Sequence, residues 1–170
     1  MRLGQPREGA TPEALELLYR THFPAFLRVA ASIAGERHAA DAVHNAFVRV
    51  LRHRESFSEG RSLEAWVWRT VVNAARDVRR AHRDEFALDD LHEPTSNGRP
   101  SAGDERVRSV VVALPPQQRL TVFLRYADLD YATIAEVLDL SAGTVAATLH
   151  KAHGTIRRRL QEEGALCRTS

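Results

Sequence analysis

The segment from Leu114 to Leu160 constrains the fold most, because it contains three helix signals separated by short turns. It reads LPPQQRLTVFLRYADLDYATIAEVLDLSAGTVAATLHKAHGTIRRRL. Proline is excluded from a helix interior but suits the first turn, so Pro115 and Pro116 predict a helix start. Leu120, Phe123 and Leu124 then recur at helical spacing, which predicts that this helix buries one face.

Two further helices follow in the arrangement of a helix-turn-helix. Asp130 can cap a helix over residues 131–138 by accepting a bond from an unpaired backbone N–H. Residues 139–141 form the predicted turn, and Ser141 is the expected cap of the next helix. The residues expected to face inward are Ile134, Ala135, Leu138, Leu140, Val145 and Leu149.

A helix-turn-helix places one exposed helix in the major groove of DNA, so DNA binding is the leading hypothesis. The face expected to point outward carries little charge. Its residues are Ala142, Gly143, Ala146, Ala147, His150 and Lys151. Arg157, Arg158 and Arg159 follow, where a phosphate backbone could be met. The alternative is that this alanine-rich face packs against protein.

The N-terminal half is predicted to be a helical lobe of three helices. Thr11-Pro12-Glu13 is a strong helix start, and this helix is expected to bend near Pro24 and end at Gly35. The second helix is expected over 39–54 and the third over 62–83, with a polar loop between them. The expected inward residues of these two helices include Ala42, Val43, Phe47, Leu51, Leu63, Trp66 and Val71. No strand-like alternation is present, so the predicted fold class is all-α.

The third helix combines tryptophans at one end with arginines along the remainder. Arginines that hold a backbone, beside rings and pockets that accept unstacked bases, suit single-stranded DNA. The structural alternative is that Trp66 and Trp68 are mainly core residues.

Charge divides the chain into three parts, although the net charge is only +2. Residues 1–83 carry an excess of arginine, 84–105 carry seven acids against Arg99, and 106–170 are again basic. Two basic lobes with an acidic tether suit a phosphate-bearing partner, whereas a solvated surface with a polar linker is the alternative. We expect a flexible N-terminus over 1–10, domains over 11–83 and 105–163, an acidic flexible linker over 84–104 and a tail over 164–170.

Other classes of protein fit the sequence poorly. The single cysteine, Cys167, cannot form an internal disulfide. No apolar run approaches the ~18–20 residues of a membrane span, and no secretory signal is evident, so we expect a cytoplasmic chain without membrane insertion. His150 and His153 share a helix face, but no third metal ligand is in view, and there is no glycine-rich phosphate loop. We therefore expect no enzyme activity, no catalytic residues, no metal and no cofactor.

Two segments together resemble the extracytoplasmic-function (ECF, group 4) sigma factors of the sigma-70 family. ADAVHNAFVRVLRHRESFSEGRSLEAWVWRTVVNAARDVRR resembles region 2, and LPPQQRLTVFLRY with YATIAEVLDLSAGTVAATLHKAH resembles region 4. The resemblance covers roughly residues 11–83 and 105–163. It implies a protein that binds core RNA polymerase, directs it to promoter DNA and helps to melt the start region.

The resemblance also implies roles for residues of the N-terminal lobe. Helix 39–54 would dock on the clamp of the largest polymerase subunit, with Asp41, Asn45, Arg49 and Arg52 as the expected contacts. The loop after it would hold a base flipped from the −10 element, which needs a pocket that receives the extruded base. The expected −10 contacts are Phe57, Ser58, Arg61, Ser62, Asn73, Arg76, Arg79 and Arg80.

In the C-terminal lobe, the resemblance implies contact with the flap of the second-largest subunit and with the −35 element. The expected −35 residues are Arg125, Ser141, Thr144, Ala146, Ala147, His150 and Lys151. This chain departs from its relatives there, because Ala146, Ala147 and Thr148 replace a basic residue, a serine and an arginine. An alanine methyl cannot make the two-pronged guanine contact of arginine, so we expect weakened −35 readout.

Many members of this group are held inactive by an anti-sigma factor, so such a partner is also expected. Two alternatives stay open at this point. One is a stand-alone helix-turn-helix regulator that binds duplex DNA without polymerase. The other is a sigma-like interaction module that does not itself support initiation.

Overall fold

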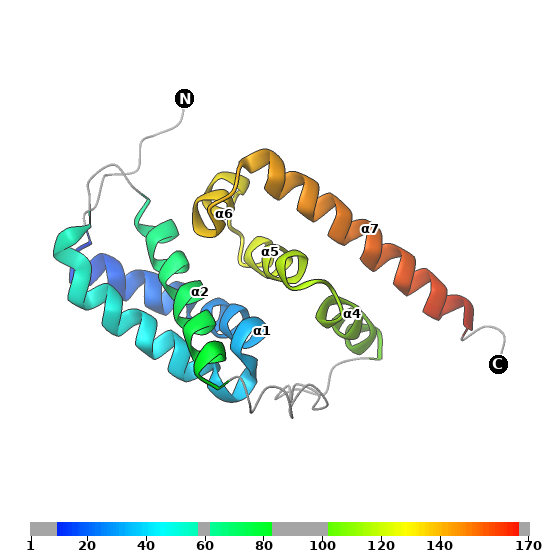
Figure 1. Cartoon of the computed structure of the whole chain (residues 1–170), viewed down its shortest axis with the longest axis horizontal. Coiled ribbons are helices and arrows are strands. Elements are labelled where there is room, and N and C mark those ends of the chain that lie inside the picture. The colour runs from blue at the N-terminus through cyan, green and yellow to red at the C-terminus, as the bar shows by residue number, and fades with distance from the viewer. Residues whose placement is uncertain (1–9, 58–61, 83–101, 167–170) are drawn as a thin grey trace.

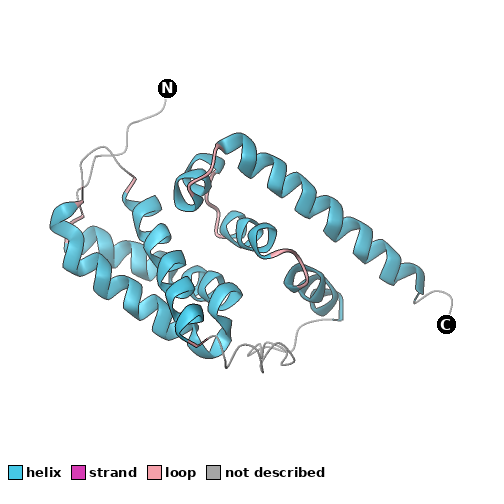
Figure 2. Cartoon of the chain, in the orientation of Figure 1, coloured by secondary structure: helices cyan, strands magenta, loops and turns pink. Residues whose placement is uncertain are grey.

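A computed structural model describes residues 10–57, 62–82 and 102–166 of the chain. Over these residues it contains helices and connecting loops but no strand, as Figure 2 shows, which confirms the predicted all-α class. The elements are α1 (Pro12–His53), the short 3-10 helix η1 (Arg54–Ser56), α2 (Leu63–Ala81), α4 (Ala102–Val112), α5 (Pro116–Tyr126), α6 (Tyr131–Leu138) and α7 (Ala142–Leu166).

Helix α1 begins where the sequence predicts and is broken at Gly35. The Thr11 hydroxyl accepts a hydrogen bond from the Ala14 backbone N–H at 3.2 Å, which caps the first turn. Gly35 adopts φ 73° and ψ 159°, a conformation that residues with a side chain rarely adopt. The break separates two helical segments, in agreement with the expected helices before and after this glycine. Pro24 lies inside the first segment without ending it.

Helix α2 packs against both segments of α1 through an aromatic core. Trp68 and Phe26 are fully buried, and their ring centroids lie 4.3 Å apart. Trp66 is only half-buried, so Trp68 alone is a core tryptophan. The expectation that Leu51 faces inward was wrong, since 49% of its surface is exposed. Leu51 comes directly after buried Val50 in the chain, and its side chain lies on the outer face of α1.

The second half of the chain starts with a helix that the periodicity did not predict. Helix α4 begins at Ala102, inside the acidic linker expected over 84–104, and α7 continues to Leu166. Three of the four valines of α4 are consecutive, at 110–112, so neither a helical nor a strand-like alternation stands out in the sequence.

The helix-turn-helix forms as predicted, with α6 and α7 capped by Asp130 and Ser141. Ile134 and Ala135 are buried as expected, but Val137 is more buried than Leu138. The reason is that α6 is covered on two sides, by α7 and by α2, rather than by α7 alone.

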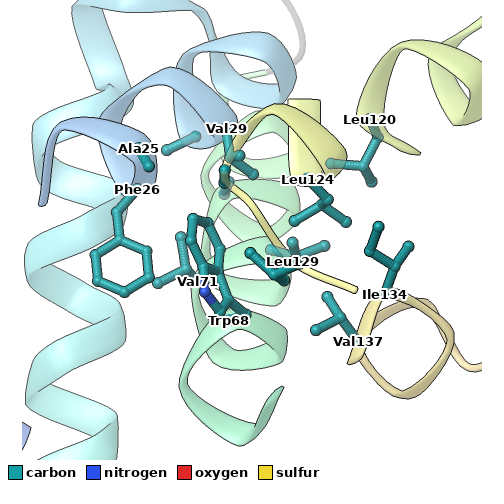
Figure 3. Packing of buried hydrophobic residues seen from close by; sticks show 14 of the residues in the cluster. Ala25, Phe26, Val29, Trp68, Val71, Leu120, Leu124, Leu129, Ile134 and Val137 are labelled. Carbon is teal, nitrogen blue, oxygen red and sulfur yellow. The ribbon is translucent and has the colours of Figure 1, made fainter. Parts of the chain in front are cut away.

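The described helices form two lobes that pack against each other. We call α1, η1 and α2 the N-terminal lobe and α4 to α7 the C-terminal lobe; Figure 1 shows α6 beside α2 and the long α7 extending away. Side chains of both lobes, among them Val29, Trp68, Leu124 and Leu129, meet in one hydrophobic cluster (Figure 3). Burial of this apolar surface is the main attraction between the lobes.

Among the residues described, two ion pairs cross the boundary between the lobes. The Arg108 guanidinium lies 2.9 Å from the Glu36 carboxylate, and that of Arg69 lies 3.9 Å from the Asp139 carboxylate. Both pairs are partly or largely exposed, so they contribute less to the packing than the apolar cluster does.

Within the described part of the chain, no single helix is both long and apolar enough to cross a bilayer. One pair, Tyr131–Leu138 with Ala142–Glu162, meets that criterion jointly, but its members are bent by 101°.

Candidate nucleic-acid and polymerase interfaces

The start of α7 is held by two hydroxyl groups that the sequence assigned to DNA contact. Ser141 Oγ accepts a hydrogen bond from the Thr144 backbone N–H at 3.0 Å and lies 2.9 Å from Thr144 Oγ1. Ser141 therefore caps the helix, and the two hydroxyls are hydrogen-bonded to each other. Both side chains are exposed, so each retains a surface toward solvent.

The outward face of α7 has the predicted composition. Ala142, Gly143, Ala147, His150 and Lys151 are exposed, and Ala146 is partly buried. Lys151 is the only formally charged residue between Ala142 and Lys151. An added Cβ at Gly143 would meet only Ser141 Oγ at 3.8 Å, so the backbone here is open to close approach. This face can make van der Waals contact with thymine methyl groups but offers few side-chain hydrogen bonds.

Arg125 lies in the last turn of α5 rather than on α7. Its Nη1 donates to the Leu129 carbonyl at 3.2 Å, and its guanidinium lies 6.0 Å from the Tyr131 ring centroid. This places the guanidinium at the outer limit of a cation–π contact. Tyr126 beside it is 75% exposed. Together these residues form a second exposed surface of the C-terminal lobe, next to the helix-turn-helix.

The expected −10 residues fall into three groups. Phe57 packs against Trp66 with ring centroids 5.2 Å apart, and Ser62 caps α2 by accepting from the Ala65 N–H. Asn73 is exposed on α2. Ser58 and Arg61 lie outside the described residues, so the pocket expected for a flipped base is only partly described.

The arginines at the end of α2 make contacts within the protein. Arg79 Nη1 donates to the Ile33 carbonyl at 3.2 Å, and Arg80 is paired with Asp77. Arg76 is exposed and, with Arg79, lines a cavity at the lobe boundary. Arg76 and Arg79 therefore face the C-terminal lobe, whereas Arg80 pairs with Asp77 within α2.

The four expected polymerase contacts form one stripe on the second segment of α1. Asp41, Asn45, Arg49 and Arg52 recur at spacings of three and four, and all four are exposed. Helical geometry therefore places them on a single face that a helical partner could follow.

Asp77 on α2 is a residue of this region that sequence reasoning missed. Its carboxylate lies 2.6 Å from Arg49 Nη1 and also pairs with Arg80. The hydrogen bond from Arg49 is the largest cause that lowers the pKa of Asp77 below its usual range, with Arg80 adding to the effect against partial burial. Asp77 joins an expected polymerase contact to an expected DNA contact. Its position after Arg76, one acid within a run of arginines, was the available signal.

No group of three or more histidine, cysteine or acidic side chains that could hold a metal ion is present among the residues described. The arrangement instead consists of exposed helix faces, which suits binding to extended partners.

Comparison with known proteins relates each lobe to a family. Residues 18–85 match the model for Sigma-70 region 2, and residues 104–153 match that for Sigma-70, region 4. The chain is 30% identical over 146 residues to the RNA polymerase sigma-E factor of Streptomyces coelicolor, covering 83% of this chain and 82% of that protein. It is 27% identical over 139 residues to the ECF RNA polymerase sigma-E factor of Escherichia coli K12, covering 71% and 73%.

Solved structures share the fold. The sigma factor RpoE of Bartonella quintana, solved with the anti-sigma factor NepR, superposes with a TM-score of 0.69 at 18% identity, covering 88% of this chain and 98% of that chain. CnrH, solved with the cytosolic domain of CnrY, superposes with a TM-score of 0.66 at 24% identity, covering 89% and 90%.

Proposed function

From the premise that this chain belongs to the sigma-70 family, as an ECF-type RNA polymerase sigma factor, we propose how its two lobes divide the work of initiation. A sigma factor binds core RNA polymerase and promoter DNA. This role depends on binding, and we assign no catalytic step to any residue. The observation that carries the assignment is the match of both lobes, in order, to regions 2 and 4. We place the protein in the cytoplasm, where RNA polymerase acts.

The N-terminal lobe would dock on polymerase and open the duplex. The stripe of Asp41, Asn45, Arg49 and Arg52 is exposed on a rigid helix, as a contact with the clamp of the largest subunit requires. Asn73 and the arginines of α2 would hold the −10 element, with Phe57 and Ser62 near the base. Arginine suits this task because its planar guanidinium grips phosphate with two parallel hydrogen bonds.

The C-terminal lobe would contact the −35 element and the flap of the second-largest subunit. The exposed face of α7 supports weak base reading, because it carries small side chains and the short hydroxyls of Ser141 and Thr144 in place of the long donors that discriminate bases. Each good two-pronged contact that is lost removes about 1–3 kcal/mol of discrimination. His150, Lys151 and Arg125 would then supply mainly positioning contacts to the backbone.

The packed lobes would have to separate for this task. Arg76 and Arg79 face α5 and α6 across the cavity, so DNA cannot occupy that side of α2 while the lobes stay together. An anti-sigma factor would favour the packed arrangement. RpoE, which shares the fold, was solved with the anti-sigma factor NepR.

The decisive experiment is transcription in vitro with purified core RNA polymerase on a library of promoters. We expect new start sites that depend on this protein, and co-purification with core enzyme. Scrambling the −35 sequence of a responsive promoter should reduce initiation less than scrambling its −10 sequence. Failure to bind core enzyme, while duplex DNA is still bound, would instead identify a stand-alone regulator.

A further inference from the structure

The outer face of α2 carries one arginine that no role has yet been given. Arg69, Asn73, Arg76 and Arg80 recur at spacings of four, three and four, which places them on one face of the helix. Asn73, Arg76 and Arg80 are exposed and are among the residues assigned to the −10 element, whereas Arg69 is half-buried. Arg69 therefore extends this row, which we call the α2 stripe, toward the start of the helix.

The helix-turn-helix lies against this end of the α2 stripe. Helix α6 packs on α2 (Figure 1), and Asp139, which follows α6, brings its carboxylate to 3.9 Å from Arg69 Nη2. At this distance the two groups form an ion pair without a hydrogen bond. The Arg69 side chain is 41% exposed and that of Asp139 is 85% exposed. Such an exposed pair is weak, so an oxyanion arriving from solvent can replace Asp139.

The backbone of Asp139 is in a conformation that favours glycine. Its φ of 59° and ψ of 48° are left-handed, and it forms the C-cap of α6. Glycine is the usual residue in such a position because it has no Cβ, although aspartate is tolerated there. Glycine would end α6 at lower conformational cost but would leave Arg69 without this carboxylate. An uncommon backbone conformation that carries a charge to the other lobe is reason to look for a function.

A carboxylate and a DNA phosphate are alternative partners for one guanidinium. Both are oxyanions that accept hydrogen bonds from arginine. In the packed arrangement the Asp139 carboxylate lies beside Arg69, and Leu138 lines the same cavity as Arg76. The end of α6 therefore meets the α2 stripe at two of its arginines, by charge at Arg69 and by packing at Arg76.

We propose that Arg69 is a further contact to the −10 element, and that Asp139 pairs with it in place of a DNA phosphate while the lobes are packed. Separation of the lobes on polymerase then releases Arg69 to the DNA. The helix-turn-helix of the C-terminal lobe thereby restrains DNA binding by the N-terminal lobe. This inference rests on the proposed function and adds to it a residue and an internal competitor.

The first test measures DNA binding by the full chain without polymerase. The probe is a short fluorescein-labelled single-stranded DNA of random sequence, because contacts to phosphate carry no sequence information. Asp139→Asn removes the carboxylate and keeps a residue that tolerates the left-handed backbone. It should tighten binding about two- to fivefold, as expected when an exposed ion pair no longer competes. Asp139→Gly should do the same.

Two comparisons separate this contact from a general gain of positive charge. Asp128→Asn removes the same charge from another exposed aspartate with a left-handed backbone, φ 64°, between α5 and α6. It should change the affinity by less than about twofold, given the screening of distant charges. Arg69→Gln, added to Asp139→Asn, should cancel the gain and lower the slope of log affinity against log salt by about 0.7, the loss of one phosphate contact.

The second test uses the complex with core polymerase on a responsive promoter. With the lobes apart, Arg69→Gln should still weaken open-complex formation, whereas Asp139→Asn should leave it unchanged. The proposal is overturned if Asp139→Asn acts no more strongly than Asp128→Asn, if its gain survives Arg69→Gln, or if neither the parent nor Asp139→Asn binds the probe. A parent chain that binds core enzyme and initiates, yet gives one of these results, refutes only the roles of Arg69 and Asp139.

Discussion

Single polar side chains fix where four helices of this protein begin. Thr11, Ser62, Asp130 and Ser141 each accept a hydrogen bond from the backbone N–H three residues on. Such a bond satisfies one of the donors that a helix start leaves unpaired. At Ser141 the same atom lies at the surface expected to meet DNA, so capping and recognition compete for one hydroxyl.

Replacing Ser141 separates these two roles. Ser141→Ala should lower the free energy of unfolding by about 1 kcal/mol, because the Thr144 N–H loses its acceptor. Ser141→Asp should retain stability, since aspartate caps equally well, but weaken binding to −35 DNA through charge repulsion. Urea denaturation and binding to promoter duplexes measure the two effects. Thr155→Ala, a helix-interior change in α7, is the control and should leave stability nearly unchanged.

Because of Asp77, the stability of the fold should depend on pH. Its pKa is lowered mainly by the hydrogen bond from Arg49, so its ion pairs stabilise the fold at neutral pH. A lowered folded-state pKa means that this contribution is complete above the unfolded value of ~3.9 and is lost as pH falls through the folded value. Asp77→Asn should therefore cost about 0.2–1 kcal/mol at pH 7, since the pair is partly exposed.

The measurement is the free energy of unfolding of both proteins between pH 7 and pH 2. The two curves should begin to approach each other below the unfolded value of ~3.9 and should converge once pH has fallen through the lower folded value, where the wild-type carboxylate also becomes neutral. Asp41→Asn is the matched control at an exposed position of α1. A difference that persisted unchanged at pH 2 would show that Asp77 acts through packing rather than charge.

At the scale of elements, the break at Gly35 divides α1 into two helical segments, and the second segment folds back on the first. A periodic sequence would otherwise continue as one long helix, and residues 12–53 would not fold back on themselves. The backbone of Gly35 has φ 73° and ψ 159°, which is accessible at low cost only without a Cβ. A single residue therefore decides how the aromatic core around Phe26 is assembled.

Two glycine-to-alanine changes should act in opposite directions. Gly35→Ala should lower the free energy of unfolding by about 1–3 kcal/mol, because alanine is strained in this conformation. Gly154→Ala, inside α7 where an added Cβ meets nothing within 4 Å, should raise it by about 0.5–1 kcal/mol. Chemical denaturation monitored by circular dichroism compares both with the parent. Equal effects of the same sign would contradict the assigned backbone conformation.

Elements with strong local signals were predictable from the sequence, whereas their mutual packing was not. Helix caps and a helix-breaking glycine act only on nearby backbone, and the helices that begin or end at them were expected at these positions. These residues are Thr11, Asp130, Ser141 and Gly35. Helix α4 lacks such signals, and the burial of Val137 depends on α2, more than fifty residues earlier. The same limit applies to function: the DNA and polymerase residues were expected from family resemblance, and their placement on exposed faces of α1, α2 and α7 is consistent with that expectation without testing it.

At the scale of the whole molecule, the lobes form one body held by a shared apolar cluster. Within this cluster, the Trp68 indole N–H is buried without an acceptor among the residues described. A buried donor left unpaired costs about 1–3 kcal/mol, which offsets part of the gain from hydrophobic burial.

The ion pair between Glu36 and Arg108 tests this closed arrangement in solution. The two residues are 72 positions apart, and their side chains lie 2.9 Å from each other only because the lobes are packed. Glu36→Arg and Arg108→Glu should each lower the free energy of unfolding by about 0.5–1 kcal/mol, since each replaces attraction with repulsion. The exchanged pair, carrying both changes, should recover most of that loss.

A double-mutant cycle on these four proteins isolates the contact from local effects of each change. Small-angle X-ray scattering on the same set should give a larger radius of gyration for both single variants and the parent value for the exchanged pair. A coupling energy near zero, together with a radius of gyration of the parent equal to that of the single variants, would mean that α4 and the turn after Gly35 do not meet in solution. The lobes would then be open before polymerase binds. A clear coupling would instead make lobe separation a step that initiation has to drive.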